Sequence, residues 1–307
     1  MTHAPPCFLP HFSAVSPVTV RRFLASLGRI AIGVIVGIVV GNPILLYFQQ
    51  EKLLFYPVTI NEGNRKVIKE RYRHVEEVTL TTADRRKLHG WYQRSPGMGR
   101  KPLLIYFGGN AEDVSFLPSA GDRVPGWSLL VINYRGYGLS EGVPGQRAIF
   151  EDALSIHDEF ARRDDVDAGR IAVMGRSLGS GVAVHLAAHR PVRAAVLVTP
   201  YDSITRVAQE KFWYAPVALL LKHPFDSLAL APGIVRPALF MVAEEDTLIP
   251  PEHARRLYEA WAGPKRWHLV KKENHDTIDF DGAYWPVIGE FLGWAPGPIA
   301  GGPARAN

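Results

Sequence analysis

The stretch that decides the fold reads RIAVMGRSLGSGVAVHLAAH, from Arg170 to His189. An apolar, strand-like run leads into the pattern Gly-x-Ser-x-Gly, and a helical pattern follows it. Gly175 and Gly179 suit a tight strand-to-helix turn, because a side chain at either position would collide with neighbouring backbone. The stretch therefore predicts a nucleophile elbow, in which Ser177 stands above the edge of a sheet and the helix N-terminus directs free N–H groups toward a reacting atom.

Short apolar runs before and after the elbow predict a sheet that is buried on both faces. They are 103–107, 128–132, 171–174, 194–198, 238–242 and 267–270. The runs 75–82 and 88–94 are separated by a polar turn and predict an antiparallel pair of strands. Helical patterns cover 145–163 and 251–261. This alternation predicts one α/β domain over 70–292, with an eight-stranded, mostly parallel, doubly wound sheet and helices on both faces.

The loops at the carboxyl ends of these strands supply an acid and a base, and reacting groups gather on such loops. Asp246 follows the run 238–242, and His275 follows the run 267–270. With Ser177 they predict a triad in which the imidazole takes the serine proton and the carboxylate orients the imidazole. Glu244 and Glu245 are weaker alternatives for the acid, because Asp246 has the better loop position. A structural turn that happens to contain a serine is the alternative for the elbow itself.

Attack on a carbonyl group also needs two N–H donors for the oxyanion that forms. One is expected at Leu178, immediately after the nucleophile. The other is expected from the loop after Phe107, which reads GGNAED. Asn110 is the first candidate there and Gly109 the second, whereas a plain Gly-Gly turn is the alternative for this loop.

A membrane anchor is predicted near the N-terminus. Residues 30–48 carry no charge and, as a helix, are about as long as a hydrocarbon core is thick. We expect one transmembrane helix over 24–48, with a cleaved signal peptide and a buried core helix as the alternatives. Arg21, Arg22 and Arg29 before this run are matched in number by Lys52, Arg65 and Lys66 after it, and Arg29, next to the run, favours a cytoplasmic N-terminus. The chain is then a single-pass membrane protein with an extracytoplasmic catalytic domain.

Composition excludes several other kinds of site. Cys7 is the single cysteine among 307 residues, which excludes an intramolecular disulfide and a two-cysteine metal site. The net charge of +5 forms no basic stripe, so no nucleic-acid partner is expected. Asp276, Asp279 and Asp281 follow His275, but their spacing fits no metal-ligand set, so no metal is expected. Residues 1–23 and 293–307 are expected to be disordered, and residues 49–69 to form a linker.

Several motifs together resemble the α/β-hydrolase superfamily. They are Phe107-Gly-Gly-Asn-Ala111, Asn133-Tyr-Arg-Gly-Tyr-Gly138, Gly175-Arg-Ser-Leu-Gly-Ser-Gly181, Thr199-Pro-Tyr-Asp-Ser203, His223-Pro-Phe-Asp-Ser227 and Glu245-Asp-Thr-Leu-Ile-Pro250. The order serine, acid, histidine also matches. More narrowly, the chain resembles the membrane-anchored branch described as serine aminopeptidase-like or α/β-hydrolase-domain-containing. The resemblance implies serine hydrolase activity without a cofactor. The chain departs from that branch at Gly108, where histidine is usual, and at Ala243, where glycine is common.

An insert over 203–223 is expected to form a small cap. Phe212, Trp213 and Tyr214 are candidates to line an acyl-binding pocket or to meet the membrane interface, and packing against the domain is the alternative. We therefore expect a membrane-tethered hydrolase of carboxylic esters or thioesters that acts on a small-molecule or lipid acyl substrate. A serine peptidase of the aminopeptidase-like type and a catalytically idle binding or scaffold module are the alternatives.

Overall fold

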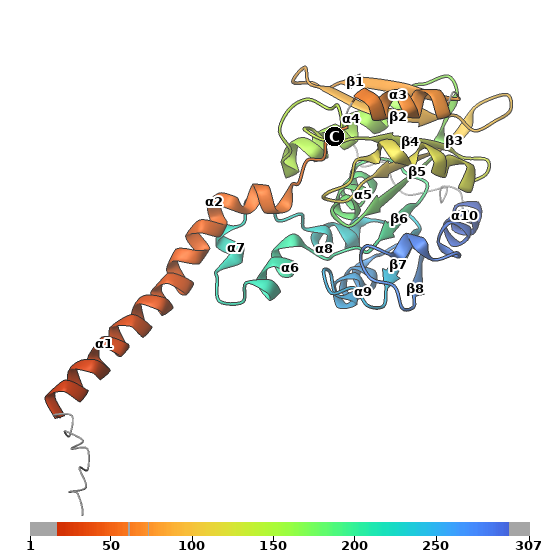
Figure 1. The fold of residues 1–307 in the computed structure, drawn as a ribbon. Coiled ribbons are helices and arrows are strands. Elements are labelled where there is room, and N and C mark those ends of the chain that lie inside the picture. Colours follow the sequence, from red (N-terminus) through yellow and green to blue (C-terminus); the bar gives the residue numbers. More distant parts are fainter. Residues whose placement is uncertain (1–16, 61, 73, 295–307) are drawn as a thin grey trace, which may run out of the picture. The chain divides into compact units, whose positions relative to one another are not determined.

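The computed structural model describes residues 17–60, 62–72 and 74–294, and the chain divides into two compact units, Met1–Phe48 and Gln49–Asn307. The described part of the first unit is helical (Figure 1). Helix α1 spans Pro17–Val36, a π-helical turn spans Gly37–Gly41, and α2 spans Asn42–Leu54, so that α2 ends inside the second unit.

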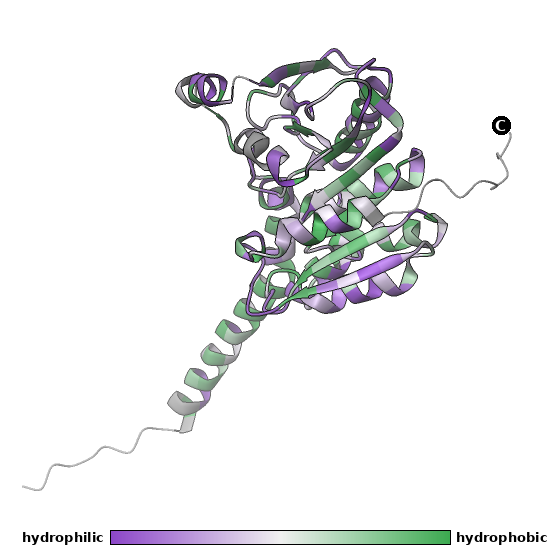
Figure 2. Cartoon of the chain, turned by 90° about the vertical axis from the view of Figure 1, so that its right-hand side faces the viewer, coloured by the Kyte–Doolittle hydropathy of each residue, from purple (hydrophilic) through white to green (hydrophobic). Residues whose placement is uncertain are grey.

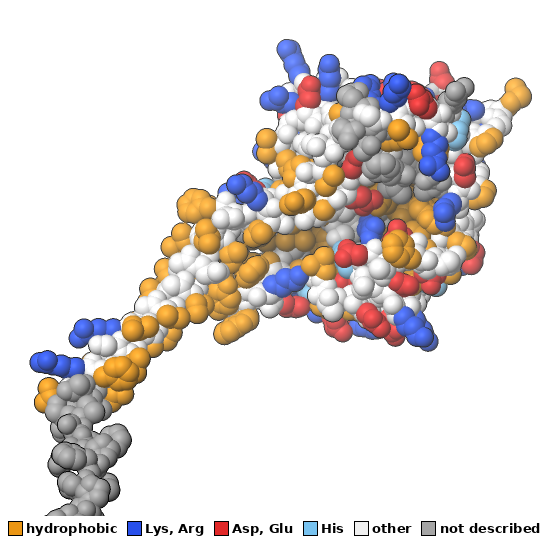
Figure 3. Space-filling view, viewed as in Figure 1, with side chains coloured by type: hydrophobic (Ala, Val, Ile, Leu, Met, Phe, Trp, Pro, Cys, Tyr) orange, Lys and Arg blue, Asp and Glu red, His pale blue; other side chains and the backbone are white. Residues whose placement is uncertain are grey.

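The segment Arg21–Leu54 is long and apolar enough to cross a membrane, by length and composition. Hydrophobic residues dominate α1 in Figure 2, and Figure 3 shows their side chains exposed along that helix. The expected anchor, 24–48, lies within this segment. Residues 17–23, which we expected to be disordered, belong to α1 instead, because no glycine or proline interrupts 18–27. Residues 1–16 lie outside the described residues.

The second unit is built on one eight-stranded sheet, in the order β1-β2-β4-β3-β5-β6-β7-β8. The strands are β1 Val75–Thr81, β2 Lys87–Gln93, β3 Lys101–Phe107, β4 Ser128–Ile132, β5 Val166–Arg176, β6 Ala195–Val198, β7 Ala238–Ala243 and β8 Lys265–Val270. Strands β1 and β2 pair antiparallel, as do β2 and β4, and the other neighbours are parallel. The predicted fold class, a mostly parallel eight-stranded sheet with helices around it, is confirmed.

Helices cover both faces of the sheet (Figure 1). They are α3 Glu62–Arg71, η2 Val114–Arg123, α4 Gln146–Ala161, α5 Leu178–His189, α6 Ile204–Lys211, α7 Val217–Leu220, α8 Ser227–Leu230, η3 Ala231–Gly233, α9 Pro251–Ala260, η4 Ile278–Phe280 and α10 Tyr284–Trp294. Because successive side chains of a strand point to opposite faces, β3 feeds two cores. Leu103 and Ile105 join the core that contains residues of α4, α5 and α9, and Leu104 and Tyr106 join the core that contains residues of α10.

Residues 49–69, which we expected to form a linker, pack on the domain. Phe55 belongs to the first core, and Ile60 and Ile68 belong to the second. These three apolar side chains explain the difference, because a free linker would leave them in water. At the other end, Gly293 and Trp294 of the expected disordered tail lie in α10, and residues 295–307 lie outside the described residues.

The winding of the sheet changes direction at β3 and β5, which are neighbours. The strand that follows β3 in the chain, β4, lies on one side of it, whereas β6, β7 and β8 extend the sheet beyond β5. At such a switch point, the loops that leave the carboxyl ends of the two strands diverge and open a crevice. The loop after Phe107 and the turn at Ser177 leave these two strand ends.

Replacing Gly179 by alanine tests the close contact between α5 and β3. A Cβ at Gly179 would overlap the carbonyl oxygen of Phe107 and lie 2.6 Å from that of Gly108. Because rigid backbone must then move, we expect Gly179→Ala to lower the free energy of unfolding by about 2 kcal/mol. The matched control is Gly289→Ala, whose Cβ meets nothing within 4 Å and which should raise stability by up to about 1 kcal/mol. Thermal unfolding of the full-length chain in detergent measures both, and an unchanged Tm for Gly179→Ala would contradict the contact.

Candidate active site

Strand β5 ends in the tight turn that the sequence predicts. Ser177 has φ +51° and ψ −119°, a strained conformation for a residue with a side chain, and α5 begins at the next residue. Glycine at both flanks permits the turn, since a Cβ on Gly175 would overlap the carbonyl group of Gly179. The N–H of Ser177 also donates to the carbonyl oxygen of Val198 in β6, at 2.9 Å. The serine side chain therefore stands half-buried at the carboxyl end of β5.

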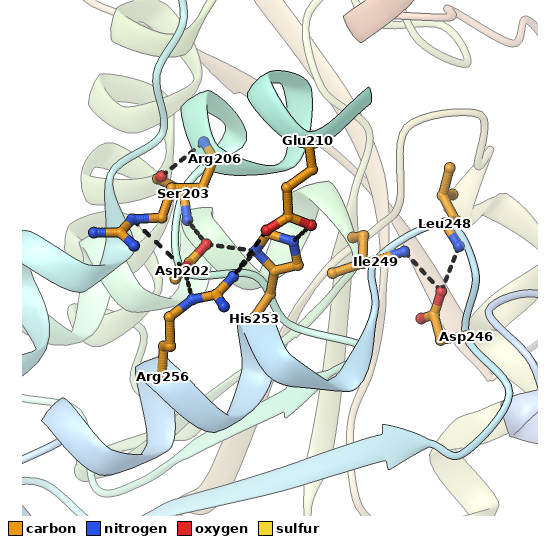
Figure 4. A network of polar contacts seen from close by, with 9 residues as sticks. All are labelled: Asp202, Ser203, Arg206, Glu210, Asp246, Leu248, Ile249, His253 and Arg256. Carbon is orange, nitrogen blue, oxygen red and sulfur yellow. Dashed lines mark hydrogen bonds and ion pairs between the residues drawn. The ribbon is translucent and has the colours of Figure 1, made fainter. Parts of the chain in front are cut away.

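The structure places the serine, histidine and aspartate from three separate loops in one hydrogen-bonded chain. Nε2 of His275, in the loop after β8, lies 2.9 Å from Oγ of Ser177. Nδ1 of the same imidazole lies 2.7 Å from Oδ2 of Asp246, in the loop after β7. The other oxygen of Asp246 accepts hydrogen bonds from the N–H groups of Leu248 and Ile249, at 2.9 and 2.8 Å (Figure 4). Asp246 and His275 are both buried, so this carboxylate is held in one orientation toward the ring.

The neighbouring acidic residues have other partners. The carboxylate of Glu244 accepts a hydrogen bond from the N–H of Lys272, and the side chains of Glu244 and Glu245 are exposed. Neither carboxylate is bonded to the imidazole, so Asp246 is the acid that the geometry favours. Among the described residues, no group of three or more His, Cys, Asp or Glu side chains is arranged to hold a metal ion.

The oxyanion donors expected from the sequence differ in whether their N–H groups are already bonded. The N–H of Leu178 has no hydrogen-bond partner within the part of the chain that the structure describes. The N–H of Gly109, in contrast, donates to Oε2 of Glu112 at 2.7 Å. The side chain of Asn110 is occupied too, since its Oδ1 accepts from the N–H of Tyr56 at 2.8 Å. The backbone N–H of Asn110 therefore remains the better second candidate.

A cavity of about 320 Å³ opens at this site. Its lining residues are Gly109, Asn110, Ala111, Glu112, Arg176, Ser177, Leu248, His275 and Asp276. The expected nucleophile, base and oxyanion loop thus face one space. The three aromatic residues of the insert do not line it: Trp213 is 80% exposed, and Phe212 and Tyr214 are partly buried elsewhere in the cap. Their role in acyl binding stays a prediction.

Two charged residues of the cavity were missed by the sequence analysis. Nη2 of Arg176 donates to the carbonyl oxygens of His275 and Asp276, both at 3.2 Å, and so ties the histidine loop to the elbow. Burial opposes the charge of this guanidinium, yet nearby Glu112 and Asp279 help to raise its pKa. The only sequence signal for Arg176 was its place inside the Gly-x-Ser-x-Gly motif.

Glu112 is the second missed residue, and it braces the oxyanion loop. Besides the N–H of Gly109, its carboxylate accepts a hydrogen bond from the hydroxyl of Tyr106, at 2.8 Å. Burial, together with this carboxylate, raises the pKa of Tyr106 well above its ordinary value, so the hydroxyl stays a donor. Glu112 lies only two residues after Asn110, and nothing in the sequence pattern distinguishes it from a solvated loop residue.

The insert is fastened to the domain by a network of polar contacts around two buried side chains, shown in Figure 4. Asp202, after β6, is fully buried and bonds Nδ1 of His253 on α9 at 2.7 Å. Glu210, on α6 of the cap, bonds Nε2 of the same imidazole at 3.0 Å. Burial alone would raise the pKa of Asp202, but hydrogen bonds from His253 and Arg256 lower it. The network thus joins α6, α9 and the end of β6.

Comparison with known proteins identifies relatives over most of this chain. Residues 88–222 match the family model described as alpha/beta hydrolase fold. The chain is 31% identical to the uncharacterized protein Rv2307c of Mycobacterium tuberculosis, over 79% of this chain and 86% of that protein. It is 29% identical to the alpha/beta hydrolase domain-containing protein WAV2 of Arabidopsis thaliana, over 72% and 79%. It is also 27% identical to the uncharacterized membrane protein YNL320W of Saccharomyces cerevisiae, over 88% and 98%.

A solved structure shows the same fold. The acetyl xylan esterase from Paenibacillus sp. R4 superimposes with a TM-score of 0.59 at 21% sequence identity, covering 81% of this chain and 99% of that chain. The sheet order, the elbow between β5 and α5 and these matches agree with one another. The chain belongs to the α/β-hydrolase superfamily.

Proposed function

We propose that this protein is a membrane-anchored serine hydrolase that cleaves carboxylic ester or thioester bonds through Ser177, His275 and Asp246. The observation that carries the proposal is the unbroken hydrogen-bonded chain from the serine hydroxyl through the imidazole to the buried carboxylate. A serine hydroxyl is a poor nucleophile by itself, and an adjacent, oriented base is what activates it. The turn at Ser177 presents the serine hydroxyl at the strand end and holds its backbone in a strained conformation, as a nucleophile elbow does.

The geometry supports a two-step reaction through an acyl-enzyme. Oγ of Ser177 attacks the carbonyl carbon while its proton passes to Nε2 of His275, and Asp246 stabilises the imidazolium. The N–H groups of Leu178 and Asn110 receive the oxyanion. The tetrahedral intermediate then collapses, the imidazolium gives its proton to the leaving oxygen or sulfur, and the acyl group stays on the serine. Water, deprotonated by the same imidazole, attacks the acyl carbon, and the imidazolium returns that proton to Oγ of Ser177 as the acid is released.

Of the two carboxylates that line the cavity, Glu112 and Asp276, only Asp276 is left to hold a substrate amine, so we propose ester or thioester cleavage ahead of aminopeptidase activity. An aminopeptidase needs a carboxylate that is free to hold the amine of its substrate. Glu112, which lines the cavity beside the serine, is already bonded to Tyr106 and to the N–H of Gly109. An idle scaffold is disfavoured in turn, because such a module has no need for three aligned catalytic groups.

Membrane anchoring is supported by the apolar segment Arg21–Leu54 and by a relative that is described as a membrane protein. Arg21, Arg22 and Arg29, at the N-terminal end of that segment, favour a cytoplasmic N-terminus, and we propose on this ground that the catalytic domain lies on the opposite side of the membrane.

Ser177→Ala tests the nucleophile. A fluorophosphonate probe should label the full-length wild type in detergent and leave Ser177→Ala unlabelled, because the probe forms a bond to an activated serine oxygen. Ser180→Ala is the matched control: Ser180 lies three residues on, its hydroxyl is bonded to the carbonyl oxygen of Ser177, and labelling should persist. Equal labelling of Ser177→Ala and wild type would falsify the proposal.

Asp246→Asn tests the orienting acid. The amide keeps the size of the side chain but favours the wrong imidazole tautomer, so we expect kcat for a p-nitrophenyl ester to fall by about 10³- to 10⁴-fold. Glu245→Gln, an exposed neighbour, should retain nearly the wild-type kcat. The same loss in both variants, with native thermal unfolding, would remove Asp246 from its assigned role.

Glu112→Ala decides which N–H completes the oxyanion hole. Removing the Glu112 carboxylate removes the hydrogen bonds that hold the loop. If the N–H of Asn110 is the donor, kcat should then fall by about 10- to 100-fold. KM should stay nearly unchanged, because the oxyanion exists only after attack. Glu112→Gln keeps an acceptor for Gly109 N–H and should recover most of the rate. A rise in kcat for Glu112→Ala would instead assign the freed N–H of Gly109 as the donor.

A further inference from the structure

Four large apolar side chains of the second unit stand exposed near the cap. They are Leu53, Tyr56, Trp213 and Leu219, which are 59%, 63%, 80% and 86% exposed. Figure 3 shows hydrophobic side chains gathered over this region of the surface. We call Trp213 and Leu219, which both belong to the insert, the cap tip. Single exposed apolar side chains are ordinary, whereas several gathered on one surface mark a place that meets a partner.

Hydrogen bonds tie the cap to the end of α2. Nε2 of Gln50 donates to the carbonyl oxygen of Leu220 at 3.1 Å, and the N–H of Lys222 donates to Oε1 of Gln50 at 2.7 Å. The ammonium group of Lys222 also lies 3.3 Å from the carboxylate of Glu51. The residues immediately after the cap tip are therefore held within hydrogen-bonding distance of Gln50 and Glu51.

The sequence places this part of α2 at a membrane surface. Residues 30–50 carry no charge, and Glu51 and Lys52 are the first charged residues after them. In a helix that crosses a bilayer, the first charges lie at the boundary between hydrocarbon and water. Because Gln50 and Glu51 bind the cap, the cap must lie at the same boundary. This step rests on the membrane anchor proposed above.

We propose that the cap is a second membrane contact, which inserts Trp213 and Leu219 into the interfacial layer of the bilayer that holds the anchor. Tryptophan suits that layer, since its ring is apolar and its N–H remains available to water and headgroups. Lys52 and Lys222 keep their ammonium groups among the lipid headgroups. Asn110 of the oxyanion loop bonds the N–H of Tyr56, five residues after Glu51, so this loop is tied to the same N-terminal segment that binds the cap. The bilayer surface, rather than a second protein, is the partner that this arrangement fits.

Site-directed spin labels measure the contact directly. Cys7 is the only cysteine, so Cys7→Ser gives a background for single labels. Trp213→Cys and Leu219→Cys report on the cap tip. Met98→Cys and Phe280→Cys are matched controls, because these apolar residues are 97% and 76% exposed and lie outside the cap. The full-length chain is reconstituted into vesicles of phosphatidylcholine and phosphatidylglycerol, and accessibility to molecular oxygen is compared with accessibility to a water-soluble nickel chelate.

The cap-tip labels should show at least a several-fold higher ratio of oxygen to nickel accessibility than the two controls. Equal ratios at all four positions would overturn the proposal. Shielding of the cap tip from both reagents, with dipolar broadening between labels, would assign the surface to a second copy of the chain and overturn it as well.

Two further measurements separate this proposal from those on which it depends. A label at Ile38→Cys, in the middle of the candidate span and 51% exposed, reports on the anchor. A membrane-embedded label at position 38 with an aqueous cap tip rejects the docking alone, whereas an aqueous label at 38 rejects the anchor and the docking together. Fluorophosphonate labelling of Ser177 reports on the hydrolase separately, since it requires neither contact.

Discussion

The contact between Gly179, at the start of α5, and the carbonyl groups that end β3 is the constraint on which the site depends. It allows the helix to begin directly above the sheet, which forces Ser177 into its strained turn. It also brings the loop after β3 against the elbow, so that Gly109 and Ser177 line the same cavity. Ser177 and the loop after β3 are thus positioned by a single close approach of backbone to backbone, which a methyl group would prevent.

Charged side chains then hold the loops that this contact brings together. Arg176 leaves the strand immediately before the nucleophile and bonds the backbone of the histidine loop. Glu112 holds the oxyanion loop through Gly109 and Tyr106. Both act on backbone groups, so they fix the shape of the loops and leave Ser177 and His275 bonded to each other. Such bracing matters because, in enzymes generally, a misplacement of about 1 Å can cost about 100-fold in rate.

Two sets of contacts hold the cap. One is the ion-pair network around Asp202 and His253, and the other is the pair of hydrogen bonds that Gln50 of α2 makes. Asp202 and His253 bind α6 to the domain, and their full burial makes the loss of either partner costly. Gln50 binds the other end of the cap to the segment that leaves the candidate span. The insert is therefore tied both to the domain, through α9, and to the last turns of the long N-terminal helix.

The sequence by itself determined the fold and the identities of the three aligned residues, because these follow from local patterns. Apolar runs of strand length, glycines around Ser177, and an acid and a histidine after successive strands are all legible along the chain. The uncharged run 30–48 likewise indicated the long helix, although not that it begins before residue 24.

Only the tertiary structure decided which oxyanion donor is occupied, where residues 49–69 pack and how far the aromatic residues of the cap lie from the serine cavity. Each of these depends on contacts between residues distant in sequence. Asn110 meets Tyr56 across 54 positions, and Arg176 meets His275 across 99. Such contacts leave no periodic signal, because a hydrogen bond requires only that two groups meet in space, and nothing in the chemistry of either residue specifies the partner.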